Sequence, residues 1–139
     1  MWTKSYSITT TKVTKEQMWK LWSDVNNWTT WDNSIDFALL NGKFEAGNFY
    51  IFQPKGSSKM KIEIYETVEN FKFTDLTNFP LAKMYGEHTF EETANGLKIT
   101  TTMKVVGILS FLWIKLVAQK IVDDLPNDMQ QQIKAAQNL

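Results

Sequence analysis

The chain has 139 residues and a mass of 16.2 kDa, the size of one ordinary domain, and its 43% of hydrophobic residues excludes disorder as its main state. It has no cysteine, so disulfides, thiolate metal sites and thiol nucleophiles are excluded. Fifteen basic residues, all of them lysine, balance fifteen acidic ones, and a neutral chain without arginine lacks the surface that nucleic-acid binding needs.

The first part of the chain predicts one strand followed by two short helices. Residues 2–11 alternate loosely between apolar and polar positions, as a strand does. Residues 14–17 (Thr-Lys-Glu-Gln) have the form of a capping box, and apolar residues follow them at helical spacing. A helix should therefore begin near Thr14, with a second helical turn over residues 26–32.

The middle of the chain predicts a long β region. Its apolar runs are separated by turn residues, and the clearest alternation sets Met60, Ile62 and Ile64 against charged neighbours. A period of two predicts one buried and one solvated face, as in a curved antiparallel sheet. The predicted strands cover residues 35–40, 47–53, 60–68, 71–76, 83–93 and 97–105.

The C-terminal part changes to a helical period near Ile108. Apolar residues recur every three or four positions from Ile114 to Ala136. This stripe predicts one amphipathic helix of about 30 residues, roughly 45 Å long. Pro126 lies inside the stripe and is expected to kink the helix or to split it in two.

The order of these elements predicts an α+β helix-grip fold in one domain over residues 1–139. A single antiparallel sheet must cover its apolar face, and only the C-terminal helix is long enough to do so. We therefore expect a seven-stranded curved sheet wrapped around that helix, with the two short helices plugging one end. Because a curved sheet and a straight helix fit together poorly, a pocket should remain between them.

Several short stretches, spread over nearly the whole chain, carry a family resemblance. They are Trp19, the segment 24–32 with its two tryptophans Trp28 and Trp31, and the stretches 44–47, 88–91, 95–100 and 124–126. Together they resemble the START-like (SRPBCC) superfamily, and within it the polyketide cyclase/dehydrase-type proteins. The resemblance implies a single START-like ligand-binding domain whose cavity takes a lipid-like, aromatic or polyketide-like molecule.

The one histidine, His88, is the main candidate for chemistry. It shares strand parity with Phe90, so its imidazole should point inward, where it could orient a ligand or act as an acid or base. The plainer alternative is a buried histidine bonded to a backbone carbonyl or water. Asp75 is expected to be solvated near a strand end; if its strand face points inward, it would instead partner His88 or be a pocket acid with a raised pKa.

Aromatic and methionine side chains are the strongest positive feature, since they suit an adaptable apolar pocket. The alternative for each of them is a place in the core, and Trp28 and Trp31 are expected more often to close the end of the sheet than to stack on a ligand. The residues expected to bind the ligand are Trp31, Phe37, Phe49, Phe73, Met84, His88, Phe90, Met103, Trp113 and Val117.

Three functions remain open. The favoured one is a binding module for a small hydrophobic or amphipathic molecule, with residues 108–113 as an apolar gate. The second is a cyclase or hydrolase-type enzyme that uses His88 as acid or base. The third is a protein-interaction domain that docks through Phe111, Leu112 and Trp113.

Other partners and cofactors are expected to be absent. One histidine and scattered carboxylates match no metal site, and no phosphate-binding glycine loop occurs. The N-terminus has no apolar signal core, and the most apolar run, residues 108–118, is too short to span a bilayer. We therefore expect a cytoplasmic monomer or homodimer without a cofactor, a metal or a membrane span.

Overall fold

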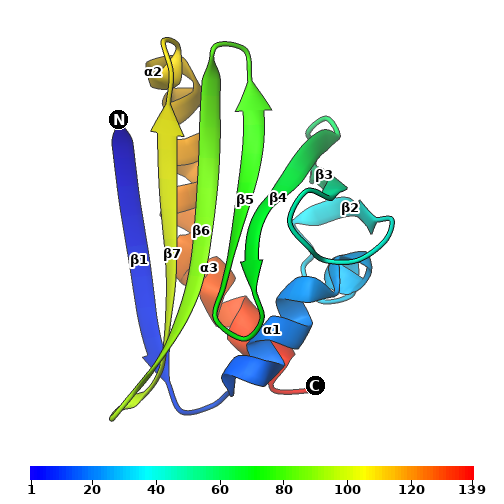
Figure 1. Cartoon of the computed structure of the whole chain (residues 1–139), viewed down its shortest axis with the longest axis vertical. Helices are drawn as coiled ribbons and strands as arrows, with labels where there is room; N and C mark the ends of the chain where they lie inside the picture. The colour runs from blue at the N-terminus through cyan, green and yellow to red at the C-terminus, as the bar shows by residue number, and fades with distance from the viewer.

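All seven strands join one antiparallel sheet in the computed structural model, which describes residues 1–139 (Figure 1). The strands are β1 (Trp2–Thr10), β2 (Ile35–Leu40), β3 (Phe49–Pro54), β4 (Met60–Val68), β5 (Lys72–Phe79), β6 (Ala82–Thr93) and β7 (Gly96–Val106). The helical elements are α1 (Lys15–Ser23), the 3₁₀ helix η1 (Val25–Thr30), α2 (Ser110–Trp113), the π-helix η2 (Ile114–Ala118) and α3 (Gln119–Ala136).

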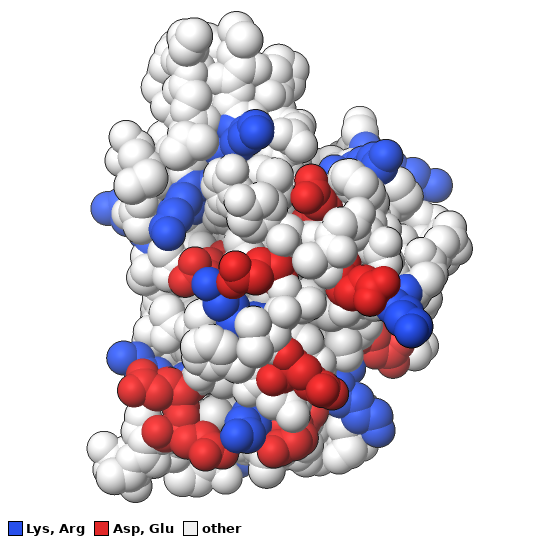
Figure 2. Space-filling model, in the orientation of Figure 1, with Lys and Arg blue, Asp and Glu red and all other residues white.

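The sheet order is β1-β7-β6-β5-β4-β3-β2, so the first strand pairs with the last. The other strands follow one another as hairpins, and α3 crosses one face of the sheet (Figure 1). The opposite face carries interleaved charges (Figure 2), including a chain in which Lys72 contacts Glu66 at 2.8 Å and Glu87 at 3.9 Å. The expected helix-grip architecture is confirmed.

The two short helices hold one end of the sheet together. The Thr14 side chain accepts from the Gln17 amide, and the Gln17 side chain accepts from the Thr14 amide, so the predicted capping box is present. The Trp28 indole donates to the Leu21 carbonyl at 3.2 Å and ties η1 to α1. Gln131 donates to the Trp31 carbonyl at 2.9 Å, which ties the end of η1 to α3.

The irregular turn of the C-terminal helix does not lie where the sequence predicts it. Helix α3 runs without a break through Pro126, so the expected split does not occur. The departure from α-helical geometry lies earlier, in the π-helical residues Ile114–Ala118. Pro126 is exposed, so its ring is accommodated on the solvent side of the helix.

The core consists of three hydrophobic clusters. The largest joins α1 and α3 to β5, β6 and β7 and includes Trp22 and Phe73. The second joins η1 to β2, β3 and β4 around Trp28 and Tyr50. The third packs η2 on β6 and β7 around Met84, with Met103 and Val105. These three clusters divide the inner face of the sheet, so a pocket can form in the space between them.

Candidate functional site

A cavity of about 250 Å³ lies between the inner face of the sheet, η1 and α3. Of the 21 residues that line it, 13 are hydrophobic. The lining consists of Trp22, Trp28, Trp31, Asp32, Ser34, Ile35, Tyr50, Phe52, Met60, Ile62, Phe73, Asp75, Thr77, Met84, His88, Thr101, Met103, Ile121, Leu125, Asp128 and Gln132. The three clusters of the core all contribute to this lining, so the cavity lies where they meet.

The exposure of the lining residues shows which side of the cavity is open. The residues from β3 to β7 are mostly buried, with Tyr50 and Thr77 each 3% exposed. By contrast, Ser34 is exposed, and Asp32 and Asp128 are half-buried. The opening therefore lies between α3 and the loop that joins η1 to β2.

A chain of polar side chains crosses three strands inside the cavity. The Nε2 atom of His88 lies 3.1 Å from Oδ2 of Asp75, and its Nδ1 atom lies 3.2 Å from Oγ1 of Thr101. The side chains of His88 and Asp75 are 18% and 17% exposed. The ring of His88 also stacks on Phe73 at 4.3 Å and meets the edge of Trp22 at 5.4 Å.

The hydrogen bonds of His88 indicate which of its two ring nitrogens carries a hydrogen in the neutral ring. An ionised carboxylate only accepts, so Nε2 carries a hydrogen and donates it to Asp75. In the neutral ring Nδ1 then accepts from the hydroxyl of Thr101. Both ring nitrogens are therefore engaged within the protein, and neither is free to contact a ligand.

Gly86 provides the space that Asp75 occupies. The two residues are direct partners across β5 and β6. A Cβ atom at position 86 would lie 2.7 Å from Oδ1 and 2.9 Å from Oδ2 of Asp75. Real Cβ atoms do not approach that closely, so the carboxylate reaches His88 over a position where only hydrogen fits.

Three side-chain oxygen atoms on the strands that line the cavity have no hydrogen-bond partner within the protein. They are the hydroxyls of Tyr50 and Thr77 and the Oδ1 atom of Asp75. The other carboxylate oxygen of Asp75, Oδ2, is hydrogen-bonded to His88. No fully buried side-chain nitrogen or oxygen lacks a partner, so these atoms remain accessible from the cavity. Burial, and then the negative charge of Asp75, raise the pKa of Tyr50 well above its ordinary value, so this phenol stays neutral.

Two further carboxylates lie at the opening. Asp128 extends from α3, and Asp32 from the loop after η1. Partial burial, the charge of Asp32 and the charge of Asp124 raise the pKa of Asp128 to about 6, while Lys120 opposes the shift. Near neutral pH the opening is therefore negatively charged.

Five of the predicted ligand-binding residues lie in the lining. They are Trp31, Phe73, Met84, His88 and Met103. Asp75 also lies there, bonded to His88, so the expectation of a solvated carboxylate is corrected in favour of the alternative. Strand parity brings these inward residues of β5, β6 and β7 together, because they occupy one face of a regular sheet.

Phe37 and Phe49 were expected in the lining, but the structure places them outside it. The β2–β3 register shifts between Ile35 and Phe37, so a bulge turns Phe37 away from the face that Ile35 occupies. Phe49 is 41% exposed, while its neighbour Tyr50 is buried. A lysine covers each ring, with the Lys59 ammonium 4.0 Å from Phe37 and that of Lys61 4.3 Å from Phe49.

The other three predicted residues pack elsewhere. Phe90 is buried in the core, stacked on Trp22 at 4.3 Å. Trp113 stacks on Phe79 at 4.4 Å, and its indole donates to the Pro80 carbonyl at 2.9 Å. Val117 packs against the Met84 cluster. No residue of 108–113 lines the cavity, so the expected gate is not at that segment.

Sequence reasoning missed several lining residues, and some of them had a detectable signal. Thr101 alternates with Ile99 and Met103, and this period already predicts the inward face of its strand. Asp128 and Gln132 follow Ile121 and Leu125 at helical spacing, so all four share one side of α3. Tyr50 had no such signal, because residues 49–52 are all apolar or aromatic and show no alternation.

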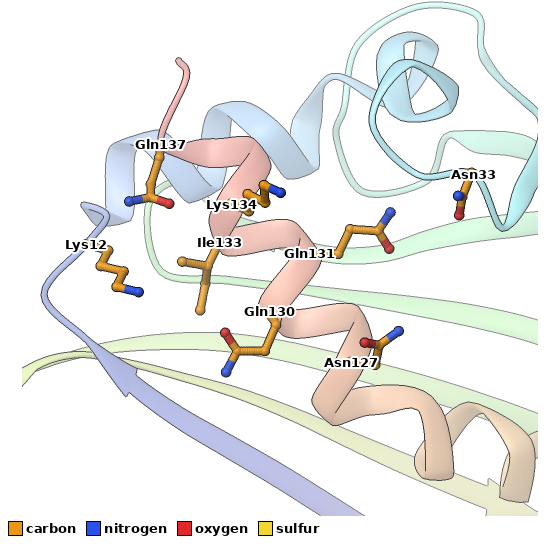
Figure 3. Close-up of a pocket in the computed structure, with 8 residues that line it drawn as sticks. All are labelled: Lys12, Asn33, Asn127, Gln130, Gln131, Ile133, Lys134 and Gln137. Carbon is orange, nitrogen blue, oxygen red and sulfur yellow. The ribbon is translucent and has the colours of Figure 1, made fainter.

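A second, larger recess of about 640 Å³ lies beside the C-terminal half of α3 (Figure 3). Only one of the eight residues that line it is hydrophobic, and all but Gln131 and Ile133 are exposed. The labelled side chains come from α3, from the loop after β1 and from the loop before β2, and they spread apart (Figure 3). Such an open polar surface is suited to water, so the smaller cavity is the better candidate site.

The end of the molecule that carries α2 shows few charged side chains in the view of Figure 2. Ile108 and Phe111 are 81% and 68% exposed, and Leu81 and Leu116 are also exposed. Of the three residues expected to dock a partner, Phe111 and Leu112 are thus accessible, whereas Trp113 is held by Phe79. No helix has the combination of length and hydropathy that crossing a bilayer requires.

The comparisons with known proteins identify the fold. No protein-family model and no curated protein matches the chain. A START superfamily protein from Mycobacterium smegmatis superposes with a TM-score of 0.68 at 12% identity, over 96% of this chain and 97% of that one. Ara h 8.0201 superposes with a TM-score of 0.67 at 16% identity, over 99% of this chain and 95% of that one.

A third solved structure is the di-domain ARO/CYC StfQ from the steffimycin biosynthetic pathway. It matches with a TM-score of 0.68 at 12% identity, over 98% of this chain and 49% of that two-domain chain. These likenesses show that the chain has the START-like helix-grip fold. Since one fold hosts many activities, the function must be argued from the cavity itself.

Proposed function

We propose that the protein binds a small amphipathic molecule in the cavity between the sheet and α3. The observation that carries this proposal is a mostly apolar cavity in which three oxygen atoms, on Tyr50, Thr77 and Asp75, have no partner in the protein. Ligand sites typically combine an apolar lining with a few such polar groups, which orient the bound molecule. Proteins of diverse kinds share this fold, including a START superfamily protein.

The size of the cavity limits the ligand. Its 250 Å³ equals the liquid volume of about eight water molecules. One aromatic ring or a short acyl chain fits this space. Burying a ring removes about 150–250 Å² from water, and at about 25 cal/mol per Å² this contributes about 4–6 kcal/mol. Lost translational and rotational freedom offsets part of this gain, so a dissociation constant of about 1 mM is expected.

The test uses 2-phenylethanol, a neutral ring with one hydroxyl, as the probe. Isothermal titration calorimetry measures its affinity, and tryptophan fluorescence reports the site because Trp22, Trp28 and Trp31 line it. Thr77→Phe places a ring in the cavity and should weaken binding about tenfold or more. Asn78→Phe, at the next and exposed position, is the matched control and should bind like the wild type.

The result can contradict the proposal in two ways. One is that small ring compounds show no saturable binding to the wild type. The other is that Thr77→Phe binds 2-phenylethanol as tightly as Asn78→Phe while its circular dichroism spectrum shows a folded protein. Either outcome would mean that the cavity is not a binding site.

A second candidate function is acid–base catalysis by His88, because Asp75 and Thr101 hold its imidazole inside the cavity. Any proton would have to reach a ligand through Thr101 or Asp75, since both ring nitrogens are engaged. Binding is favoured for this reason. Hydrolysis of 4-nitrophenyl acetate distinguishes the two: a rate above that of buffer, lost in His88→Gln, would favour the enzyme.

A further inference from the structure

The charged residues of the cavity are almost all of one sign. Asp32, Asp75 and Asp128 line it, together with His88, and none of the 21 lining residues is lysine. This imbalance is local, since the whole chain has equal numbers of basic and acidic residues. Lys120 acts on Asp128 from outside the lining and is itself paired with Asp124 at 2.9 Å. An anionic ligand would therefore meet three carboxylates and no compensating cation.

The apolar part of the lining is also suited to a cation. Six of its side chains are aromatic rings, Trp22, Trp28, Trp31, Tyr50, Phe52 and Phe73. The face of such a ring carries negative charge density and attracts an ammonium group, most strongly in tryptophan. Phe37 and Phe49 already hold lysine ammonium groups in this way on the outer surface. The cavity offers the same kind of contact to a ligand from several sides.

The unpartnered oxygen atoms identify where the charge would bind. Tyr50 and Thr77 are each 97% buried by residue area, and their hydroxyls have no partner in the protein. Oδ1 of Asp75 is also a free acceptor, since only Oδ2 is bonded to His88. A primary ammonium group has three donors and no acceptor, and each of these oxygens can accept a hydrogen bond from it.

We propose that the cavity selects a small amphipathic amine, with its ammonium group at Asp75, over neutral or anionic molecules of the same shape. This inference rests on the proposed function and names its ligand class. The carboxylates of Asp32 and Asp128 at the opening add a negative potential that draws a cation in. The ring or chain of the amine packs against Met84, Met103 and the aromatic side chains.

The experiment compares three molecules that differ only in the terminal group. Phenethylamine, 2-phenylethanol and 3-phenylpropanoate carry a phenylethyl unit with a positive, a neutral and a negative end. Calorimetry at pH 7.5 keeps the amine protonated, since alkylammonium groups ionise near pH 10. The amine is expected to bind about tenfold or more tightly than either other molecule, the range that a charged hydrogen bond supports.

Two variants test whether the ammonium group of the ligand binds at Asp75. Asp75→Asn keeps an acceptor for His88 but removes the negative charge, so the preference for the amine should fall to about threefold or less. Asp36→Asn is the matched control, because Asp36 is exposed and outside the lining. If Asp75→Asn folds poorly, Tyr50→Phe tests the same site by removing one acceptor while leaving the ring.

The outcomes separate this inference from the proposed function. Preferential binding of the amine that is lost in Asp75→Asn and kept in Asp36→Asn supports the inference. If 2-phenylethanol or 3-phenylpropanoate binds as tightly as phenethylamine, the inference is overturned and the proposed function stands. If none of the three molecules binds the wild type, both are overturned.

Discussion

At the scale of single residues, the hydrogen bonds that join Asp75, His88 and Thr101 depend on a glycine, because Gly86 has no side chain to displace Asp75. Asp75 and His88 are not opposite each other in the sheet: Asp75 pairs with Gly86, and His88 pairs with Phe73. The carboxylate reaches His88 diagonally, across the Cα atom of Gly86. The glycine is required here for space, because its backbone conformation is one that any residue can adopt.

Gly86→Ala is expected to lower the free energy of unfolding by about 1–3 kcal/mol, the usual effect of overpacking. The new Cβ would force Asp75 away from His88. Urea denaturation measures the change. In an Asp75→Ala background the same substitution should have little effect, since the clash is gone. An equal loss in both backgrounds would show that the glycine serves another purpose.

Asp128 makes stability depend on pH, and the sign follows from its raised pKa. The folded state holds the proton up to about pH 6, while the unfolded state loses it near pH 3.8. Stability contributed by the protonated form is thus lost as the pH rises between these values and stays lost above them. Asp32 and Asp124 drive this shift after burial itself, and Lys120 opposes it.

Asp128→Asn should therefore be more stable than the wild type at pH 7.5, by about 1 kcal/mol after allowance for solvent screening. Near pH 3 the two proteins should have equal free energies of unfolding, because the carboxyl is then protonated in both the folded and the unfolded state. Urea denaturation at both pH values tests this, with Asp36→Asn as the control. A gain of the same size at both pH values would contradict it.

At the scale of elements, the C-terminal helix combines two irregular features with different origins. Pro126 cannot donate to the Val122 carbonyl, yet α3 continues through it because the ring faces solvent and the neighbouring turns are packed. The π turn at Ile114–Ala118 lies where the helix passes from the apolar end to the cavity. A π turn inserts an extra residue and shifts which side chains face the sheet.

Pro126→Ala is expected to raise the free energy of unfolding by about 1 kcal/mol or more, because the helix gains a hydrogen bond to Val122. The position is exposed, so no packing is lost. Gln130→Ala, one turn later and also exposed, should change it by less than about 0.5 kcal/mol. A loss of stability in Pro126→Ala would mean that the proline sets the course of the helix.

At the scale of the whole molecule, the cavity joins parts of the core that otherwise pack separately. Trp22 belongs to the cluster of α1 and α3, Tyr50 to that of β2–β4, and Met103 to that of β6, β7 and η2. All three line the cavity. A molecule bound there would contact all three clusters at once, so its effect should extend through the fold.

Phenethylamine at a concentration one hundred times its dissociation constant is expected to raise the free energy of unfolding by about 2.7 kcal/mol. Hydrogen exchange should slow in β3 and β4 and also in β6 and β7, since residues of both regions line the cavity. Thr77→Phe should show neither effect. Slower exchange in only one of these regions would show that the bound molecule does not bridge the clusters.

The sequence alone determined the elements of this protein and their order. The capping box at Thr14, the alternation over Met60–Val68 and the helical stripe of α3 involve residues that are neighbours along the chain. Such patterns depend on local hydrogen bonds and on the period of one strand or helix, which a sequence displays directly. The helix-grip arrangement follows from them, because one sheet and one long helix can cover each other in few ways.

Only the tertiary structure decided which side chains share the cavity. The pairing of Asp75 with His88 needs the register of β5 and β6 and the gap at Gly86. The outward turn of Phe37 needs a bulge, and the inward turn of Tyr50 needs a parity that residues 49–52 do not display. Register and bulges depend on contacts between strands distant in the sequence, and one misplaced residue moves a side chain to the opposite face.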